Sequence, residues 1–203
     1  MDRPAGRDRR DPDGRGWPVA FNGVTETIVA TPNDDGGWNQ AAFGVHAGDP
    51  PWGRSWGETT THRNLTRAGT GVMQFPTDPI AVVEAALGTY VTDGPVLTTA
   101  AAWVSVEATV RDRGTEGGTT WTEWVLTPGN HGIRERTVPT LRRARTAVIE
   151  AAVAASRLDV DAYDHGRLKA VLNRAAATVD RTGTERERAA VDRIAALTDW
   201  TPA

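Results

Sequence analysis

Three consecutive threonines stand where a helix is expected to begin, and this arrangement could bind an anion. They are Thr59, Thr60 and Thr61, and Asn64 follows about one helical turn later. Backbone N–H groups in the first turn of a helix lack partners within the helix, and the helix dipole favours negative charge there. Hydroxyl and amide groups can donate further hydrogen bonds to phosphate oxygens. The segment therefore predicts either a phosphate site or, more simply, an ordinary threonine cap.

No other residues follow a familiar catalytic or metal-binding pattern. The chain has no cysteine, which excludes disulfides, thiolate metal sites and cysteine nucleophiles. The serines lack a nucleophile-elbow context, and the glycine-rich stretches fit neither a Walker loop nor a dinucleotide fingerprint. We therefore expect no metal site, and the residue types assign no catalytic side chain. The histidines lack metal-ligand spacing: they are His46, His62, His131 and His165.

Composition places the chain among folded globular proteins. Its 203 residues suffice for one domain with a tail or for two small domains, and 39% of them are hydrophobic. The net charge of −3 predicts no basic surface for nucleic acid. No apolar run approaches the roughly 20 residues that a membrane span needs, and no signal peptide opens the chain. We expect a cytoplasmic protein that binds neither nucleic acid nor a membrane.

The threonine run lies among short strands and helices that must position it. β-prone residues at 24–31 and 38–45 flank a turn of Asn, Asp and Gly, which predicts a hairpin. A loop over 47–53 is rich in Gly, Pro and Trp, a composition that often accompanies function. The threonines then lead into a helix over 61–68, and Gly69 is expected to end it in the left-handed conformation.

Further strands follow this helix. A short strand is predicted over 71–75, and Asp78 then caps a helix that begins with Pro79 and runs to Leu87. Two longer strands are predicted over 101–111 and 119–126, joined by a glycine-rich turn. Alternation in the first of these gives it one apolar face, formed by Val104, Val106, Ala108 and Val110.

From residue 138 onward the hydrophobic period changes to 3.6, which predicts helices. The first covers 140–157, and the second covers 162–181 with Asp161 as its cap. Thr184 and Glu187 form a capping-box pattern that begins a third helix. The expected buried face of the first helix comprises Leu141, Ala144, Val148, Ala151 and Ala155. A charged stripe at seven-residue spacing, either a solvated ion-pair row or a dimer contact, comprises Arg143, Glu150 and Arg157.

These patterns divide the chain into three parts. Residues 1–17 are dense in Arg, Asp, Gly and Pro and are expected to form a disordered arm. The strands and short helices over 18–137 form one domain, and the helices over 138–203 form a C-terminal extension.

Read in order, several segments resemble a known family. They are the strands at 24–31 and 39–45, the threonine run and helix at 59–65, the Phe-Pro-Thr-Asp-Pro segment at 75–79 and the Arg-rich helix at 141–158. Together they are similar to the DUF447 family of archaeal and bacterial proteins. That family belongs to the FMN-binding split-barrel group, which includes flavoredoxin-like flavin reductases. The resemblance implies an α+β, mainly β fold: a split β-barrel with a helical C-terminal extension.

The resemblance also implies a cofactor and its site. FMN is the expected cofactor, held between the two subunits of a homodimer, with NAD(P)H or another small molecule as redox partner. Trp52 or Trp56 is the best candidate to stack on the flavin, although packing is the commoner role of tryptophan. The ring is expected to meet Asn39, Gln40, Ala41 and Ala42. The phosphate and ribityl chain are expected to meet Thr59, Thr60, Thr61 and Asn64.

The chain departs from the family pattern at two places. Ala42 stands where proline is usual, and Thr60 stands where the phosphate segment usually carries a basic residue. The candidates to replace the missing charge are Arg54, Arg63 and Arg67. Two functions stay open: an FMN-dependent oxidoreductase of unknown substrate, or a non-catalytic flavin carrier. The second class includes a split barrel that has lost its cofactor or exchanged it for deazaflavin or haem.

Overall fold

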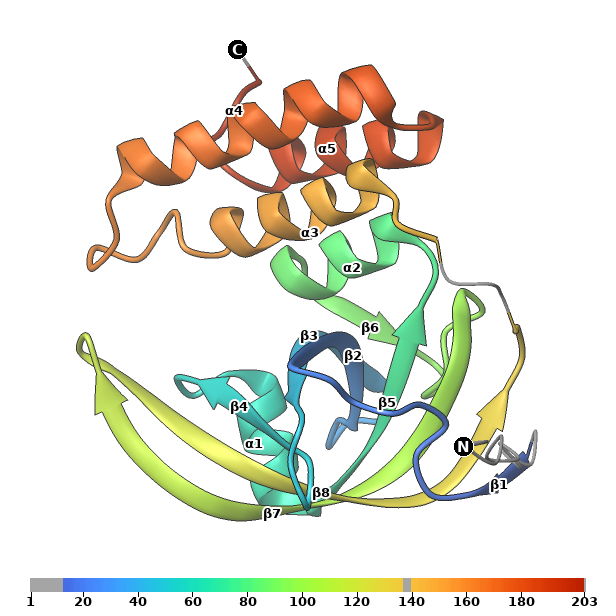
Figure 1. The fold of residues 1–203 in the computed structure, drawn as a ribbon. Coiled ribbons are helices and arrows are strands. Elements are labelled where there is room, and N and C mark those ends of the chain that lie inside the picture. Colours follow the sequence, from blue (N-terminus) through green and yellow to red (C-terminus); the bar gives the residue numbers. More distant parts are fainter. Residues whose placement is uncertain (1–12, 137–139, 203) are drawn as a thin grey trace, which may run out of the picture.

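The computed structural model describes residues 13–136 and 140–202, and it contains a closed β-barrel covered on one side by helices (Figure 1). Six antiparallel strands close the barrel in the order β8-β4-β3-β2-β5-β7, and β7 pairs back with β8. The barrel strands are β2 (Val24–Pro32), β3 (Trp38–His46), β4 (Trp52–Trp56), β5 (Thr70–Pro76), β7 (Ala100–Glu116) and β8 (Thr119–Ile133).

The predicted hairpin at the start of the barrel is confirmed. β2 and β3 pair from Val24 opposite His46 to Pro32 opposite Trp38. Gly36 and Gly37 make the turn at φ 86° and 76°, values that an L side chain rarely adopts. The short strand β6 (Tyr90–Thr92) adds to the other edge of β3.

The β7–β8 hairpin is longer than predicted. The strands span 17 and 15 residues, and Gly117 and Gly118 form the turn with positive φ. Val104, Val106 and Ala108 point into the barrel, as expected from the alternation. Val110 was expected on the same buried face, but 44% of it is exposed, because the pairing of β7 with β5 ends at Glu107 and the hairpin continues beyond the barrel (Figure 1).

Part of the predicted disordered arm is ordered. Residues 1–12 lie outside the described residues. The strand β1 (Asp13–Arg15) pairs with β8, so its backbone groups join the edge of the sheet. Trp17 packs edge-on against Phe21, with 4.8 Å between the ring centroids. A composition rich in Arg, Asp and Gly therefore did not prevent pairing, because the free edge of β8 supplies partners that composition does not reveal.

Two short helices follow the predicted bounds closely. Helix α1 (Thr60–Ala68) has Thr59 as its N-cap, and Gly69 ends it in the left-handed conformation. Helix α2 (Pro79–Leu87) has Asp78 as its N-cap and ends at Gly88. The faces of α2 pack on different cores. Ala81 and Ala85 pack with Ile28 of the barrel, whereas Val83 belongs to the core of the C-terminal helices.

Three further helices form the extension, and the first and the last of them contact α2 (Figure 1). They are α3 (Arg143–Ala155), α4 (His165–Thr182) and α5 (Glu185–Leu197). The predicted cap Asp161 is wrong: Asp164 accepts from the backbone N–H of Arg167 at 3.0 Å and begins α4. Leu141 was expected in the buried face but is fully exposed, because α3 begins only at Arg143. The other predicted members of that face, Ala144, Val148, Ala151 and Ala155, are buried.

Ion pairs join α5 to α2. The guanidinium of Arg186 donates to both carboxylate oxygens of Asp78, at 2.8 and 2.5 Å. The guanidinium of Arg193 does the same to Glu84, at 2.5 and 3.1 Å. Two-pronged pairs of this kind constrain orientation as well as distance, so they add to the apolar packing of the extension on α2.

The predicted fold class is confirmed: the chain is α+β, a split β-barrel with a helical C-terminal extension. In residues 13–136 and 140–202, no helix combines the length and the apolarity that are needed to cross a membrane.

Glu187 is the buried charge on which the start of α5 depends. It is 1% exposed, accepts from the backbone N–H of Thr184 at 2.9 Å and pairs with Arg142 at 2.7 Å. Burial by itself would raise the pKa of Glu187, but the hydrogen bonds from Thr184 and the charge of Arg142 outweigh it. They hold the pKa below its ordinary value.

We predict that Glu187→Gln lowers the free energy of unfolding at pH 7 by about 1–3 kcal/mol, because Arg142 loses its charged partner. The lowered pKa means that the unfolded chain binds the proton more tightly. The contribution of Glu187 is therefore present above its unfolded pKa of about 4.3 and is lost as the pH falls through the folded value. Urea denaturation at pH 7 and pH 3 checks both points. Equal stability of the two proteins at pH 7 would contradict the role of Glu187.

Candidate functional site

The main candidate site is a cavity of about 520 Å³ between the barrel and the helices, here called the barrel–helix cavity. Its volume lies within the roughly 300–1,000 Å³ typical of small-molecule sites. One wall consists of β3, β4 and the start of α1. The other wall consists of α2 and residues 149–157 in and after α3. The cavity therefore joins the two parts of the chain.

All four residues predicted to meet a flat ring line this cavity: Asn39, Gln40, Ala41 and Ala42. Gln40 is 1% exposed, and its side-chain amide is used within the protein. Its Nε2 donates to Thr92 at 2.8 Å, and its Oε1 accepts from Gln74 at 2.7 Å. Gly44 follows two residues after Ala42, and it also lines the cavity. Because Ala42 and Gly44 carry little or no side chain, a planar group can approach the β3 backbone closely.

The three predicted threonines also line the cavity, and each hydroxyl oxygen already accepts a hydrogen bond. Thr59 accepts from the backbone N–H of His62 at 3.3 Å. Thr60 accepts from the guanidinium of Arg63 at 3.1 Å, and Thr61 accepts from the side-chain amide of Asn39 at 3.0 Å. The hydroxyl hydrogens are donors in none of these bonds. Threonine capping and anion binding are thus compatible here, because the cap uses the oxygen and leaves the hydrogen.

Asn64, the fourth predicted phosphate residue, does not line the cavity. Its Nδ2 donates to Thr31 Oγ1 at 3.1 Å and to Asn33 Oδ1 at 2.9 Å. Asn64 is 5% exposed and faces the end of β2 rather than the opening of α1. One helical turn places Asn64 about 5.4 Å further along the axis of α1, away from the N-terminus that lines the cavity. Its role is to tie α1 to the first hairpin.

The arginines proposed to replace the missing basic residue lie in different places. Arg54 lines the cavity, but its Nη2 pairs with Glu123 at 2.7 Å and its guanidinium lies 4.3 Å from the ring centroid of Trp121. The guanidinium of Arg63 donates a hydrogen bond to the hydroxyl of Thr60, as described above. Arg67 pairs with Asp34 at 2.7 Å, beside the first hairpin and away from the cavity lining.

Arg157 is a cavity residue that the sequence pattern did not assign to the site. It was expected on one stripe with Arg143 and Glu150, but α3 ends at Ala155 and Arg157 therefore leaves that stripe. No local signal distinguishes it from the other arginines of the extension, because its place at the cavity depends on how the extension packs against the barrel.

Of the two tryptophans proposed to stack on a ring, Trp56 reaches the cavity and is 43% exposed. Trp52 is not among the lining residues. It stacks on His46, with 3.9 Å between the centroids and 8° between the planes. Within residues 13–136 and 140–202, no group of three or more His, Asp or Glu side chains gathers in a way that could hold a metal ion.

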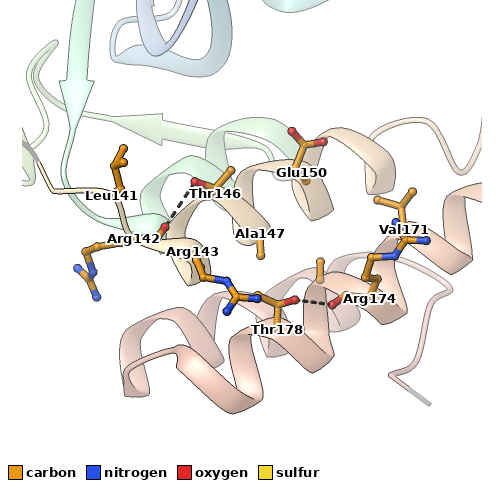
Figure 2. Close-up of a pocket in the computed structure, with 10 residues that line it drawn as sticks. Leu141, Arg142, Arg143, Thr146, Ala147, Glu150, Val171, Arg174 and Thr178 are labelled. Atoms are coloured by element: carbon orange, nitrogen blue, oxygen red, sulfur yellow. Dashed lines mark hydrogen bonds between the residues drawn. The ribbon is translucent and has the colours of Figure 1, made fainter.

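A second depression of about 500 Å³ lies between α3 and α4 and is here called the α3–α4 groove (Figure 2). Arg143 and Glu150 line it, together with apolar residues that include Ala147 and Val171. Thr178, which also lines it, donates to the backbone carbonyl of Arg174 at 3.0 Å, a bond within α4. None of the residues predicted to bind a cofactor lies in this groove.

Comparisons with known proteins agree with the fold. The family model described as "Protein of unknown function (DUF447) N-terminal domain" matches residues 25–135. A second model, described as "Protein of unknown function (DUF447)", matches residues 142–196. A search of curated proteins found no match.

Solved structures include one with the same architecture. It is an FMN-bound DUF447 protein, MM1853, from Methanosarcina mazei. It is 23% identical and covers 87% of this chain and 96% of its own, with a TM-score of 0.75. The flavin reductase of styrene monooxygenase from Pseudomonas putida S12 is 16% identical, covers 58% of this chain and 93% of its own and has a TM-score of 0.38. An FMN-binding protein from Thermus thermophilus is 16% identical, covers 61% and 94% and scores 0.36.

The last two scores are too low to establish more than a distant likeness. The two family models, however, match the barrel and the extension in turn, and the first alone spans more than half of the chain. The likeness to MM1853 extends over both parts. The chain therefore belongs to the DUF447 family.

Proposed function

We propose that the protein binds FMN in the barrel–helix cavity and acts as a cytoplasmic FMN-dependent oxidoreductase on a small molecule. The observation that carries this proposal is the meeting of two features in one cavity: three threonine hydroxyls at a helix N-terminus, and the small residues Ala41, Ala42 and Gly44 of β3. A phosphate suits the first feature and a planar ring suits the second. The FMN-bound state of MM1853, which shares this fold, supports the same choice of ligand.

The phosphate end of the proposed site is the start of α1. The side chain of Thr59 accepts from His62, so one first-turn N–H is capped, while the N–H groups of Thr60 and Thr61 have no partner within the helix. Together with the hydroxyl hydrogens of the threonines, they present several donors to one anion. The helix dipole adds favourable electrostatics at this end. These donors replace, in part, the basic residue that the family pattern carries at the position of Thr60.

The ring end of the proposed site is the β3 backbone over Ala42 and Gly44. Their small side chains allow an isoalloxazine ring to approach the strand, and the indole of Trp56 stands at the cavity wall as an aromatic neighbour. A bound flavin supplies the hydride chemistry, so the role of these residues is to position the ring and to limit the access of water.

FMN binding is testable by titration. We predict that the fluorescence of FMN is quenched or shifted when the protein binds it. Thr60→Val should weaken the affinity of the protein for FMN by about ten-fold, since one hydrogen bond to a charged group is lost. Thr60 is not the cap, so the fold should tolerate this change. Thr66→Val is the matched control, because Thr66 is exposed on the same helix outside the cavity. Riboflavin, which lacks the phosphate, should bind both variants and the unaltered protein equally. If the unaltered protein does not bind FMN in the titration, the proposal is wrong.

A non-catalytic flavin carrier is the second candidate, and the threonine in place of a basic residue favours it. Anaerobic reduction separates the two functions. An oxidoreductase loaded with FMN should lose the visible flavin absorption on addition of NADPH or NADH, and it should regain that absorption when an acceptor is added. Bound flavin that stays oxidised under both nucleotides would instead assign the carrier role. The absorption spectrum of the freshly purified protein also detects deazaflavin or haem in place of FMN.

We propose further that a second copy of the chain covers the cavity. Trp56 and Val24 support this, since 43% and 54% of these apolar residues are exposed. Val24 lies beside the cavity residue Gly44, where an added Cβ would stand 3.2 Å from Val24 Cγ1. Burying such a rim on association is favourable.

Sedimentation equilibrium should show a dimer, and Trp56→Asp should shift the equilibrium toward the monomer with a parallel loss of FMN affinity. A monomer that binds FMN at full strength would refute this part.

A further inference from the structure

The barrel–helix cavity is built by both parts of the chain. β3, β4 and α1 belong to the barrel domain. The segment 149–157 belongs to the extension and contributes Ile149, Ala152, Val153, Ser156 and Arg157 to the lining. The first four are small or uncharged. Arg157 is the charged residue that the extension places in the cavity.

Arg157 has no carboxylate partner within residues 13–136 and 140–202. Its Nη1 donates to the backbone carbonyl of Val153 at 3.3 Å, and its guanidinium lies 5.5 Å from the ring centroid of Tyr163. The other arginine of the cavity lining, Arg54, pairs with Glu123. Glu26 is the carboxylate among the lining residues, but it forms no ion pair with Arg157. Among the residues that the structure describes, no anion therefore balances the charge of Arg157 at the cavity.

The two contacts of Arg157 orient the side chain without neutralising it. A carbonyl oxygen and an aromatic face each constrain the guanidinium, yet one hydrogen bond leaves several of its N–H donors unused. The planar fork of a guanidinium matches two oxygens of a phosphate, and its partial burial strengthens such a contact relative to one in open water.

We propose that Arg157 binds a phosphate-type group of the ligand in the barrel–helix cavity, so that the helical extension takes part in ligand recognition. This rests on the proposed function only for the identity of the ligand. The phosphate has two candidate sources: the monoester of FMN and the phosphates of a nicotinamide nucleotide. In either case the ligand bridges the barrel and the extension. Its binding should then stabilise the folded chain as a unit.

The test compares Arg157→Gln with Arg174→Gln. Arg174 is the matched control, because it is an exposed arginine of the same extension that lies in the α3–α4 groove and has no ion pair among the described residues. Far-UV circular dichroism and thermal melting first establish that both variants fold. If Arg157→Gln does not fold, Arg157→Lys, which keeps the charge and loses the fork, takes its place. Each folded variant is titrated with FMN, with riboflavin and, once loaded with FMN, with NADP⁺ as a non-reducing probe.

A loss of about ten-fold or more in FMN affinity, with riboflavin affinity unchanged, assigns Arg157 to the flavin phosphate. Unchanged FMN affinity with a similar loss for NADP⁺ assigns it to the nucleotide. Arg174→Gln should change neither. Equal affinities of Arg157→Gln and the unaltered protein for all three probes would overturn the inference.

A separate measurement applies if the unaltered protein binds no FMN, which would defeat the proposed function. Inorganic pyrophosphate should then still raise the melting temperature of the unaltered protein, and it should fail to do so for Arg157→Gln. If pyrophosphate has no effect on the unaltered protein, or an equal effect on the variant, Arg157 is not an anion-binding residue.

Discussion

The fold depends on the burial of one short helix from several sides. Helix α2 is apolar around nearly its whole circumference, as expected for a helix enclosed by protein rather than one lying on a surface. Ala81 and Ala85 pack on the barrel, and Val83, which is fully buried, packs among the C-terminal helices. Burying a valine side chain contributes roughly 1.5–3 kcal/mol to the stability of the fold. Exposure of α2, on either its barrel side or its extension side, would therefore destabilise the protein. The helix therefore joins the hydrophobic core of the C-terminal helices to a core formed with the barrel strand β2.

The polar positions of α2 serve the same connection. Asp78 caps the helix and also receives Arg186, and Glu84 receives Arg193. Apolar packing holds the extension on the barrel, and the two-pronged ion pairs add a directional constraint. The barrel–helix cavity follows from this arrangement, because α2 and the segment 149–157 form the wall that faces β3 and the start of α1. Any ligand of that cavity would contact both parts of the chain.

Local patterns predicted most of the elements and part of the site. The β2–β3 hairpin, the caps of α1 and α2 and the capping box of α5 arise from a few adjacent residues, and all were predicted close to their observed positions. Thr59 to Thr61 line the cavity because a helix start is itself a local feature. Asn64 lies outside the cavity lining, since its partners Thr31 and Asn33 come from a distant strand end. Leu141 was misassigned because apolar spacing does not reveal where a helix begins.

Most of the elements, the caps of α1, α2 and α5 and the likeness to the family follow from local sequence, because hydrogen bonding and side-chain spacing act between neighbours along the chain. The cap of α4 and the strand β1 do not. Which residues share the cavity depends on how the elements pack in the folded chain. Arg157 and Thr60 are nearly a hundred positions apart. They line one cavity because α2 is buried between the barrel and the extension, and burial depends on surfaces that meet only after the chain has folded. Packing in the folded chain likewise explains why Arg54 lines the cavity. Arg67 does not line it, because it pairs with Asp34 beside the first hairpin.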